Sequence, residues 1–192
     1  MTTQAPYILV LYYSRHGSVL NLARAIAKGI ESEGLEARLR TVAHTHDEID
    51  ALPYPLVDSD DLLHASGLAM GSPCQFGMMA SPLKAFWETT SSAWLKGELI
   101  DKPACVFTSS SSLHGGNEST LLSMSLPLLH HGMMLLGVPY SEPALLSTDS
   151  GGTPYGASHV SGVRTQSELT DAERNICHTL GRRIATIAKQ LQ

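Results

Sequence analysis

The chain has few cysteines and few positive charges, and both shortages exclude classes of protein. Its three cysteines, Cys74, Cys105 and Cys177, are an odd number without CxxC spacing, so thiols alone build neither a disulfide scaffold nor a four-cysteine zinc site. Thirteen Lys and Arg against eighteen Asp and Glu give a net charge of −5, the wrong sign for a nucleic-acid backbone or an anionic membrane. We therefore expect no nucleic acid and no membrane among the partners.

Long apolar runs are also absent. Residues 1–6 carry no basic region, and the apolar run Tyr7–Tyr13 is far shorter than the about 20 residues that span a bilayer. Together with the unpaired cysteines, this predicts an unanchored cytoplasmic protein. The 192 residues, 43% hydrophobic and 16% charged, suffice for one folded unit, and we expect a single domain over residues 1–192.

Several common site motifs are missing. The sequence has no GxGxxG, no GK[ST] and no GxSxG, which argues against a classical dinucleotide fold, a P-loop nucleotide triphosphatase and an α/β-hydrolase. His44, His46 and His64 do not form an HxH pair with a third ligand on a rigid element, so we expect no metal site.

Strand-like segments recur along the chain. The continuous β-prone run Tyr7–Tyr13 is typical of a strand covered on both faces, in the middle of a parallel sheet. Residues 36–42 alternate polar and apolar side chains, which predicts an edge strand with one solvent-exposed face. Further strands are expected at residues 67–70, 104–108 and 133–138.

Helical spacing of apolar residues predicts four helices between and after these strands. They cover residues 19–30, residues 81–90 with Ser81 as the cap, residues 117–130, and a segment opened by the capping box Thr170 to Glu173. Pro127 should kink the third helix or delay its start. The last helix is expected to bury Ile176, Leu180, Ile184, Ile187 and Leu191. Such alternation predicts an α/β fold with five parallel strands between two helical layers.

Three polar loops follow the first, third and fourth expected strands. Ligands of open α/β sheets bind at the carboxyl ends of the strands, so these loops are the candidate site. In residues 14–18, hydroxyls and a glycine precede a helix N-terminus, which suits a phosphate, although a serine-capped turn reads the same way. Residues 71–77 fix an aromatic side chain at the sheet edge, and residues 109–116 offer four serines before glycines. Each alone is also compatible with an ordinary polar turn.

Motifs spread over the whole chain resemble those of the WrbA-type NAD(P)H:quinone oxidoreductases, flavodoxin-like proteins that bind FMN. They are LVLYYSxxG from Leu9, GSPxxFGxM from Gly71, WxxGxL from Trp94, VFTS from Val106, LHHGM from Leu129 and GGTPYGA from Gly151. The resemblance implies a flavodoxin-like, three-layer fold with strand order 2-1-3-4-5. It also implies a homotetramer.

The resemblance further implies a set of FMN-binding residues. The phosphate would be held by Ser14, Arg15, His16, Gly17, Ser18 and Val19. The ribityl chain and ring would be lined by Pro73, Cys74, Gln75, Phe76 and Gly77. The polar edge of the ring would be wrapped by Ser109, Ser110, Ser111, Ser112, Leu113, His114 and Gly115, and the pocket completed by His130. Substrates, NADH or NADPH and quinones, would contact Trp94, Phe76 and His16, partly across a subunit boundary.

Some of these residues have alternative interpretations. Cys74-Gln75-Phe76 replaces the family's usual Thr-Arg-Phe, and His16 replaces a frequent Tyr, so the preference between NADH and NADPH stays open. We expect Cys74 to line the pocket rather than act as a nucleophile, and Trp87 to be a core aromatic. His130 and His131 could instead be protonated imidazoles at the negative end of a helix.

The expected reaction needs no catalytic side chain. NAD(P)H would deliver hydride to FMN and leave, and a quinone would accept hydride in the same space, a two-electron ping-pong scheme. The alternatives are a one-electron carrier of the flavodoxin type and an FMN-binding regulatory protein. Residues 139–167 are aperiodic, rich in Gly, Ser and Pro, and longer than most structureless loops. We expect them to close over the flavin edge or a neighbouring subunit.

Overall fold

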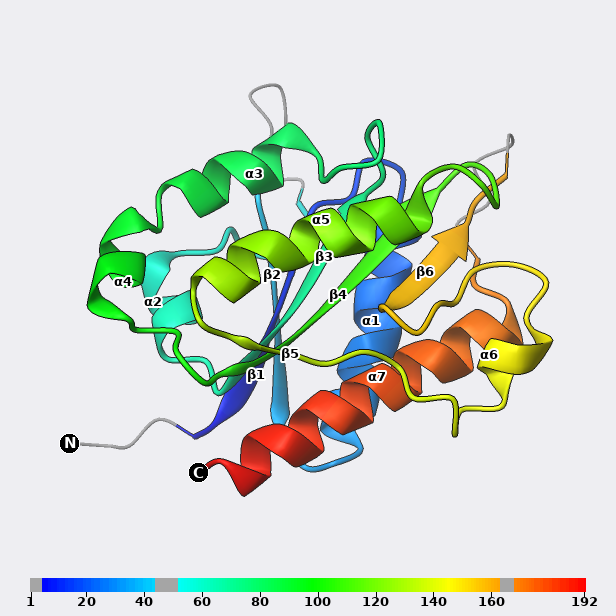
Figure 1. Cartoon of the computed structure of the whole chain (residues 1–192). Coiled ribbons are helices and arrows are strands. Elements are labelled where there is room, and N and C mark those ends of the chain that lie inside the picture. The colour runs from blue at the N-terminus through cyan, green and yellow to red at the C-terminus, as the bar shows by residue number, and fades with distance from the viewer. Residues whose placement is uncertain (1–4, 44–51, 163–167) are drawn as a thin grey trace.

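The computed structural model describes residues 5–43, 52–162 and 168–192, and shows a parallel sheet between two layers of helices (Figure 1). The strands are β1 Tyr7–Tyr12, β2 Glu36–Thr41, β3 Gly67–Pro73, β4 Pro103–Ser110, β5 Met134–Leu135 and β6 Ala157–Val160. The helices are α1 Ser18–Glu31, α2 Ser59–Leu63, α3 Ser81–Glu88, α4 Ser91–Lys96, α5 Asn117–His130, α6 Ala144–Ser147 and α7 Asp171–Gln190. No helix in these ranges is long and apolar enough to cross a bilayer.

The strand order β2-β1-β3-β4-β5 confirms the predicted topology, with β2 at an edge. Successive side chains of β1 point to opposite faces of the sheet. Helices cover both faces, so every side chain of this strand is buried. Ile8 and Val10 pack with α1 and α7 on one side, whereas Leu9 and Leu11 pack with α3 and α5 on the other. Two hydrophobic cores therefore flank the sheet.

The expected last strand over residues 133–138 is wrong in extent. β5 has only two residues and pairs with the first two residues of β4, Pro103 and Ala104. The chain leaves the sheet at Gly137, where a Cβ would lie 2.2 Å from the carbonyl oxygen of Pro154, and Pro139 has no N–H for a ladder. The outer position beside the second half of β4 is taken instead by β6, parallel to residues 107–110.

The segment 139–167 is therefore not aperiodic throughout, contrary to expectation. It contains the short helix α6 and the buried strand β6. The sequence Ala157-Ser-His-Val160 has too few apolar residues to be recognised as a buried strand. Its polar side chains can be buried because tertiary partners satisfy their hydrogen bonds. Residues 163–167 lie outside the described ranges.

α1 and α7 pack closely on one face of the sheet. A Cβ at Gly181 would lie 2.2 Å from the carbonyl oxygen of Ile26, so only glycine permits this backbone approach. Ile176, Leu180 and Ile184 of α7 are buried as predicted. The prediction was wrong for the end of the helix, where Ile187 is only half-buried and Leu191 is exposed.

Other helix boundaries also differ from expectation. α5 begins at Asn117 with Pro127 inside it, so a late start is excluded. The N-cap of α3 is Ala80, with Ser81 already helical, and a separate helix, α4, follows α3. Trp87 is buried, as predicted for a core aromatic.

Candidate functional site

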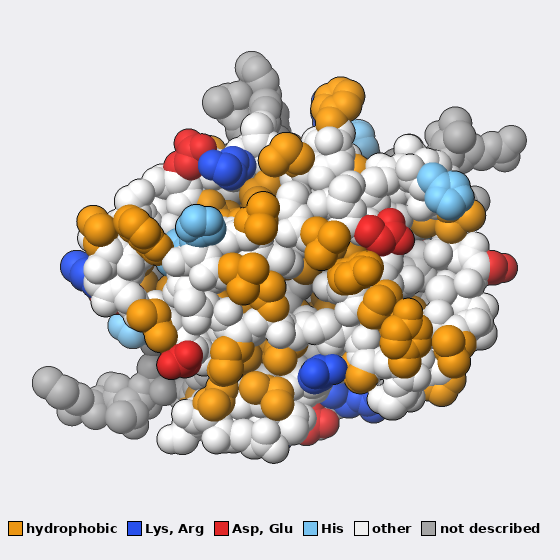
Figure 2. All heavy atoms as spheres, viewed as in Figure 1, with side chains coloured by type: hydrophobic (Ala, Val, Ile, Leu, Met, Phe, Trp, Pro, Cys, Tyr) orange, Lys and Arg blue, Asp and Glu red, His pale blue; other side chains and the backbone are white. Residues whose placement is uncertain are grey.

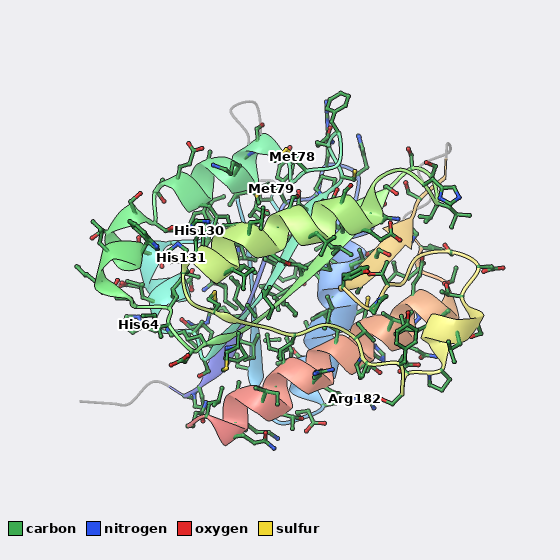
Figure 3. All side chains as sticks on the ribbon, in the orientation of Figure 1. His64, Met78, Met79, His130, His131 and Arg182 are labelled. Carbon is green, nitrogen blue, oxygen red and sulfur yellow. The ribbon has the colours of Figure 1, made fainter. Side chains whose placement is uncertain are left out.

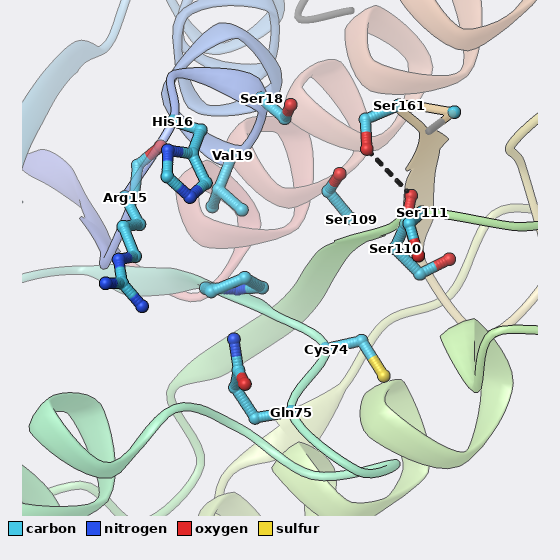
Figure 4. Close-up of a pocket in the computed structure, with 13 residues that line it drawn as sticks. Arg15, His16, Ser18, Val19, Cys74, Gln75, Ser109, Ser110, Ser111 and Ser161 are labelled. Carbon is cyan, nitrogen blue, oxygen red and sulfur yellow. Dashed lines mark hydrogen bonds between the residues drawn. The ribbon is translucent and has the colours of Figure 1, made fainter. Parts of the chain in front are cut away.

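A cavity of about 410 Å³ opens where β1, β3 and β4 end, at the N-terminus of α1 (Figure 4). Parallel strands direct their carboxyl ends to one edge of the sheet, so the three loops that follow these strands meet there. The lining residues are Ser14, Arg15, His16, Ser18, Val19, Pro73, Cys74, Gln75, Ser109, Ser110, Ser111, Ser161 and Gly162. Eleven of these thirteen are among the predicted site residues.

The first loop is shaped by hydrogen bonds to Ser14. Its Oγ accepts from the backbone N–H groups of Gly17 and Leu20, both at 3.2 Å, which leaves its own O–H free to donate. Gly17 has φ 92°, a conformation that favours glycine. The N–H groups of Ser18 and Val19, in the first turn of α1, have no acceptor among the described residues. The loop therefore offers anion-binding donors at the positive end of a helix.

The second and third loops are joined through Cys74. Its backbone N–H donates to the carbonyl oxygen of Ser109 at 2.8 Å, and its Sγ lies 3.0 Å from the carbonyl oxygen of Gly115. A Cβ on Gly116, which has φ +95°, would lie 3.2 Å from the same sulfur. Cys74 thus fixes the distance between two walls of the cavity, as a lining residue does.

The polar groups of the cavity are mostly uncharged. The hydroxyls of Ser18, Ser109 and Ser111 have no hydrogen-bond partner among the described residues, and Arg15 contributes a cation to the lining. Neutral hydroxyls and helix-end amides suit a ligand that combines a phosphate with alcohol groups. The geometry can therefore bind and orient such a tail.

A second, more apolar cleft of about 700 Å³ adjoins this cavity and shares Arg15 and Gln75 with it. Its walls are mainly hydrophobic and include Tyr13, Phe76, Met78, Met79, Pro82 and Leu126. Phe76 stands fully exposed at the tip of a tight turn, with φ 54°. An exposed aromatic at a strained backbone position is expected at a binding surface rather than in a stable core.

Trp94 and His130 lie together in a third pocket, of about 340 Å³, between α4 and the end of α5. Figure 3 shows His130 and His131 at this end of α5. His131 is buried, and burial together with neighbouring His130 lowers its pKa. This lowered pKa disfavours the alternative in which His131 is a protonated imidazole at the negative end of the helix.

The structure does not bring every predicted residue into the main cavity. Gly17, Gly77 and Gly115 support the loops without lining it, while Ser112, Leu113 and His114 form an exposed turn. Conversely, Ser161 and Gly162 line the cavity but were not predicted. They follow β6, and the one signal for them was their place shortly after the GGTPYGA motif.

Metal ligands were not expected. His44 and His46 lie outside the described residues. Among residues 5–43, 52–162 and 168–192, no group of three His, Cys, Asp or Glu side chains is arranged to hold a metal ion.

Residues 6–141 match the NADPH-dependent FMN reductase family, and the chain belongs to this family. It is 41% identical to the NAD(P)H dehydrogenase (quinone) of Chromohalobacter salexigens, over 96% of this chain and 98% of that protein. The protein of the same name from Geotalea daltonii is 38% identical, over 96% and 97%. These relatives confirm the resemblance inferred from the motifs.

Solved structures confirm the flavodoxin-like fold. The WrbA-like flavodoxin of Agrobacterium tumefaciens superposes with a TM-score of 0.73 at 23% identity, covering 98% of this chain and 100% of that one. A flavodoxin from the Archaea superposes with a TM-score of 0.66 at 21% identity, covering 95% and 99%.

Proposed function

We propose that the protein is an FMN-dependent NAD(P)H:quinone oxidoreductase. The observation that carries this proposal is the convergence of three loops on one serine-rich cavity at the start of α1, continuous with an apolar cleft. The relatives named NAD(P)H dehydrogenase (quinone), to which this chain is similar over nearly their full length, support the same activity.

The residues present fit FMN by the chemistry of their donors. The free N–H groups of Ser18 and Val19, with the hydroxyl of Ser14, would hold the phosphate. Hydroxyls of the β4 loop would bind the ribityl chain and the polar edge of the ring, and Cys74 would keep the two walls in place. Arg15 would add a cationic contact from the described part of the lining. When bound, FMN supplies the hydride transfer from NAD(P)H to a quinone.

The apolar cleft suits flat substrates. Phe76 and Met79 offer hydrophobic surface beside the cavity, and aromatic rings stack favourably on such side chains while water is displaced. His16, in the lining of the cavity, would contact the nucleotide. These residues position substrates, and none needs to exchange a proton with them.

A homotetramer would complete this site. α5 is apolar on both faces: Leu121, Met124 and Leu128 are buried, whereas other leucines point to solvent. Exposed hydrophobic side chains of α5 are Leu122, Leu126 and Leu129, and Phe76 and Met78 of the second loop are also exposed. Figure 2 shows hydrophobic side chains gathered on this face of the molecule. A helix that is hydrophobic all round is normally buried. We therefore infer that α5 packs against another subunit, which would bring Trp94 and His130 to a neighbouring flavin.

Titration of the purified apoprotein with FMN tests the cofactor assignment. We expect saturable quenching of flavin fluorescence, followed by NADH or NADPH oxidation that depends on added benzoquinone. Double-reciprocal plots at several quinone concentrations should give parallel lines, as a ping-pong scheme requires. Absence of FMN binding would refute the proposal.

The same preparation separates this function from its rivals. Stepwise reduction under anaerobic conditions should pass directly from oxidised to two-electron-reduced flavin. Accumulation of a one-electron-reduced flavin, together with slow quinone turnover, would indicate a flavodoxin-type carrier. Tight FMN binding without any NAD(P)H oxidation would indicate a regulatory binding protein.

A further inference from the structure

A fully buried carboxylate, Glu173, joins three parts of the chain near the cavity. Its two oxygens accept hydrogen bonds from side-chain and backbone donors, four of them 13 to 23 residues away in the sequence and one three residues away. The donors are Ser150 Oγ (2.8 Å), Gly151 N (2.9 Å), Val160 N (3.2 Å), His159 Nδ1 (2.9 Å) and Thr170 N (2.9 Å). A capping box needs only the bond to Thr170, so most of this network serves another purpose.

Of the other bonds of Glu173, those from His159 and Val160 hold β6, and those from Ser150 and Gly151 hold the loop before it. His159 is also fully buried, and Val160 is the last residue of the strand. β6 has a limited ladder of its own, since among the described strands it pairs with β4 alone, from Phe107 to Ser110. The charge-assisted bonds from His159 and Val160 to one carboxylate therefore supply much of what holds the strand in register.

β6 ends at the cavity. The N–H of Ser161 donates to the carbonyl oxygen of Ser110 at 2.9 Å, and its Oγ donates to the same oxygen at 3.2 Å. Figure 4 shows Ser161 facing the cavity from the side opposite Gln75. Gly162 follows with φ +66° and also lines the cavity. Three walls come from the loops after β1, β3 and β4, and these two residues make a fourth.

We propose that β6 with Ser161 and Gly162 forms a strap that holds the tail of the cofactor, and that Glu173 is the positioning residue of this strap. The inference rests on the proposed function, because it takes FMN as the ligand. It adds a contact from a strand outside the three loops, and it assigns a role to the buried Glu173–His159 pair.

The hydrogen-bonding state of the strap specifies which part of the cofactor it contacts. The hydroxyl of Ser161 already donates to Ser110, so its lone pairs can accept from a ribityl hydroxyl. The N–H of Gly162 has no acceptor among the described residues and can donate to a tail oxygen. Neither group offers the flat surface that the ring requires. The strap therefore binds the tail, not the ring.

The first test is Ser161→Ala, with flavin affinity measured by fluorescence quenching of the apoprotein. We expect the Kd values of FMN and of riboflavin to rise together by about threefold to tenfold, the effect of one lost hydrogen bond. A loss of affinity for FMN but not for riboflavin would also support the strap, and would show that the strap contacts the phosphate. The matched control is Ser125→Ala, whose hydroxyl bonds within α5, and its Kd values should stay unchanged.

The second test concerns Glu173. Glu173→Gln replaces one acceptor oxygen with an NH2 group, which cannot accept hydrogen bonds from the donors around it. We therefore expect β6 to shift and the Kd of FMN to rise at least tenfold. The double variant with Ser161→Ala should bind no more weakly than Glu173→Gln alone, because both changes remove the same contact. Thr170→Ala removes the α7 cap without touching β6; it should lower the melting temperature yet leave the Kd unchanged.

The outcomes separate this inference from the proposed function. If the wild-type apoprotein does not bind FMN, the proposed function fails. If it binds FMN and Ser161→Ala binds equally well while folded, only the strap fails. If the increases in the Kd of FMN caused by Ser161→Ala and Glu173→Gln multiply in the double variant, Glu173 stabilises the fold without positioning the strap. The same conclusion holds if Thr170→Ala weakens FMN binding as much as Glu173→Gln does.

Discussion

The indole N–H of Trp94 donates a hydrogen bond to the backbone carbonyl oxygen of His130 at 2.9 Å. This bond joins α4 to the end of α5 and leaves the indole about half exposed. Both residues were expected beside the flavin, yet they line a pocket separate from the serine-rich cavity. The arrangement is consistent with a wall that serves a neighbouring subunit, and it yields the first prediction.

Trp94→Ala should raise the KM for quinone about tenfold and leave the Kd of FMN within twofold, because the indole offers a stacking surface and lies outside the cavity that binds the tail. Trp94→Phe keeps an aromatic wall and should raise KM much less. Steady-state kinetics and FMN titration of both variants provide the check. A large loss of FMN affinity in either variant would place Trp94 in the cofactor pocket instead.

Cys74→Ala should retain at least a third of the wild-type turnover, because the sulfur links Gly115 to the second loop and takes no part in the reaction. Cys74→Ser, which keeps a hydrogen-bonding group, should be nearer still to wild type. Both are measured as kcat with saturating NAD(P)H and quinone. A hundredfold loss of kcat in Cys74→Ala would instead indicate a redox role for the thiol.

Leu126→Glu should dissociate the assembly, because it buries a charge in the inferred subunit interface on α5. The control is Leu191→Glu, since Leu191 is similarly exposed (54% against 58%) but lies at the end of α7. Light scattering after size-exclusion chromatography should give a smaller mass for the α5 variant alone, with a matching fall in quinone reduction. An unchanged mass would rule out α5 as the interface.

Acid should destabilise the protein through Glu173. Although burial by itself would raise the pKa of this carboxyl, its hydrogen bonds with His159, Thr170 and Gly151 prevail and lower the pKa from 4.5 to about 2. A depressed folded-state pKa contributes stability that is complete above pH 4.5 and is lost as the pH falls towards 2. The contribution is about 3 kcal/mol. Urea unfolding between pH 6 and pH 3 should show this loss in the wild type and a smaller one in Glu173→Gln.

Sequence patterns predicted the elements that depend on contacts between residues close in the sequence, and the strand that is buried on both faces. The run Tyr7–Tyr12 is apolar at every position because it is covered on both faces, and the capping box at Thr170 forms as expected because its partners are three residues apart. β6 was missed because its buried polar residues depend on distant partners. His159 is tolerated inside the protein because Glu173, fourteen residues away, accepts a hydrogen bond from its Nδ1.

The candidate site divides in the same way. The loops after β1, β3 and β4 could be predicted, because parallel strands place their carboxyl ends together and each loop has a recognisable composition. Ser161 and Gly162 were not predicted, because the GGTPYGA motif before them does not show where the chain re-enters the sheet. The grouping of Trp94 with His130 in a separate pocket was equally hidden, since it depends on how α4 packs against α5.

The amino-acid sequence by itself determined the parallel α/β sheet and the chemistry of its three ligand-binding loops, because periodicity and composition act over a few residues, whereas the strand order was implied by the family resemblance. The tertiary structure alone decided which strand closes the sheet beside β4, which carboxylate holds that strand, and which hydrophobic faces stay exposed for a partner. Those features depend on contacts between residues far apart in the chain, whose free energies no local pattern records.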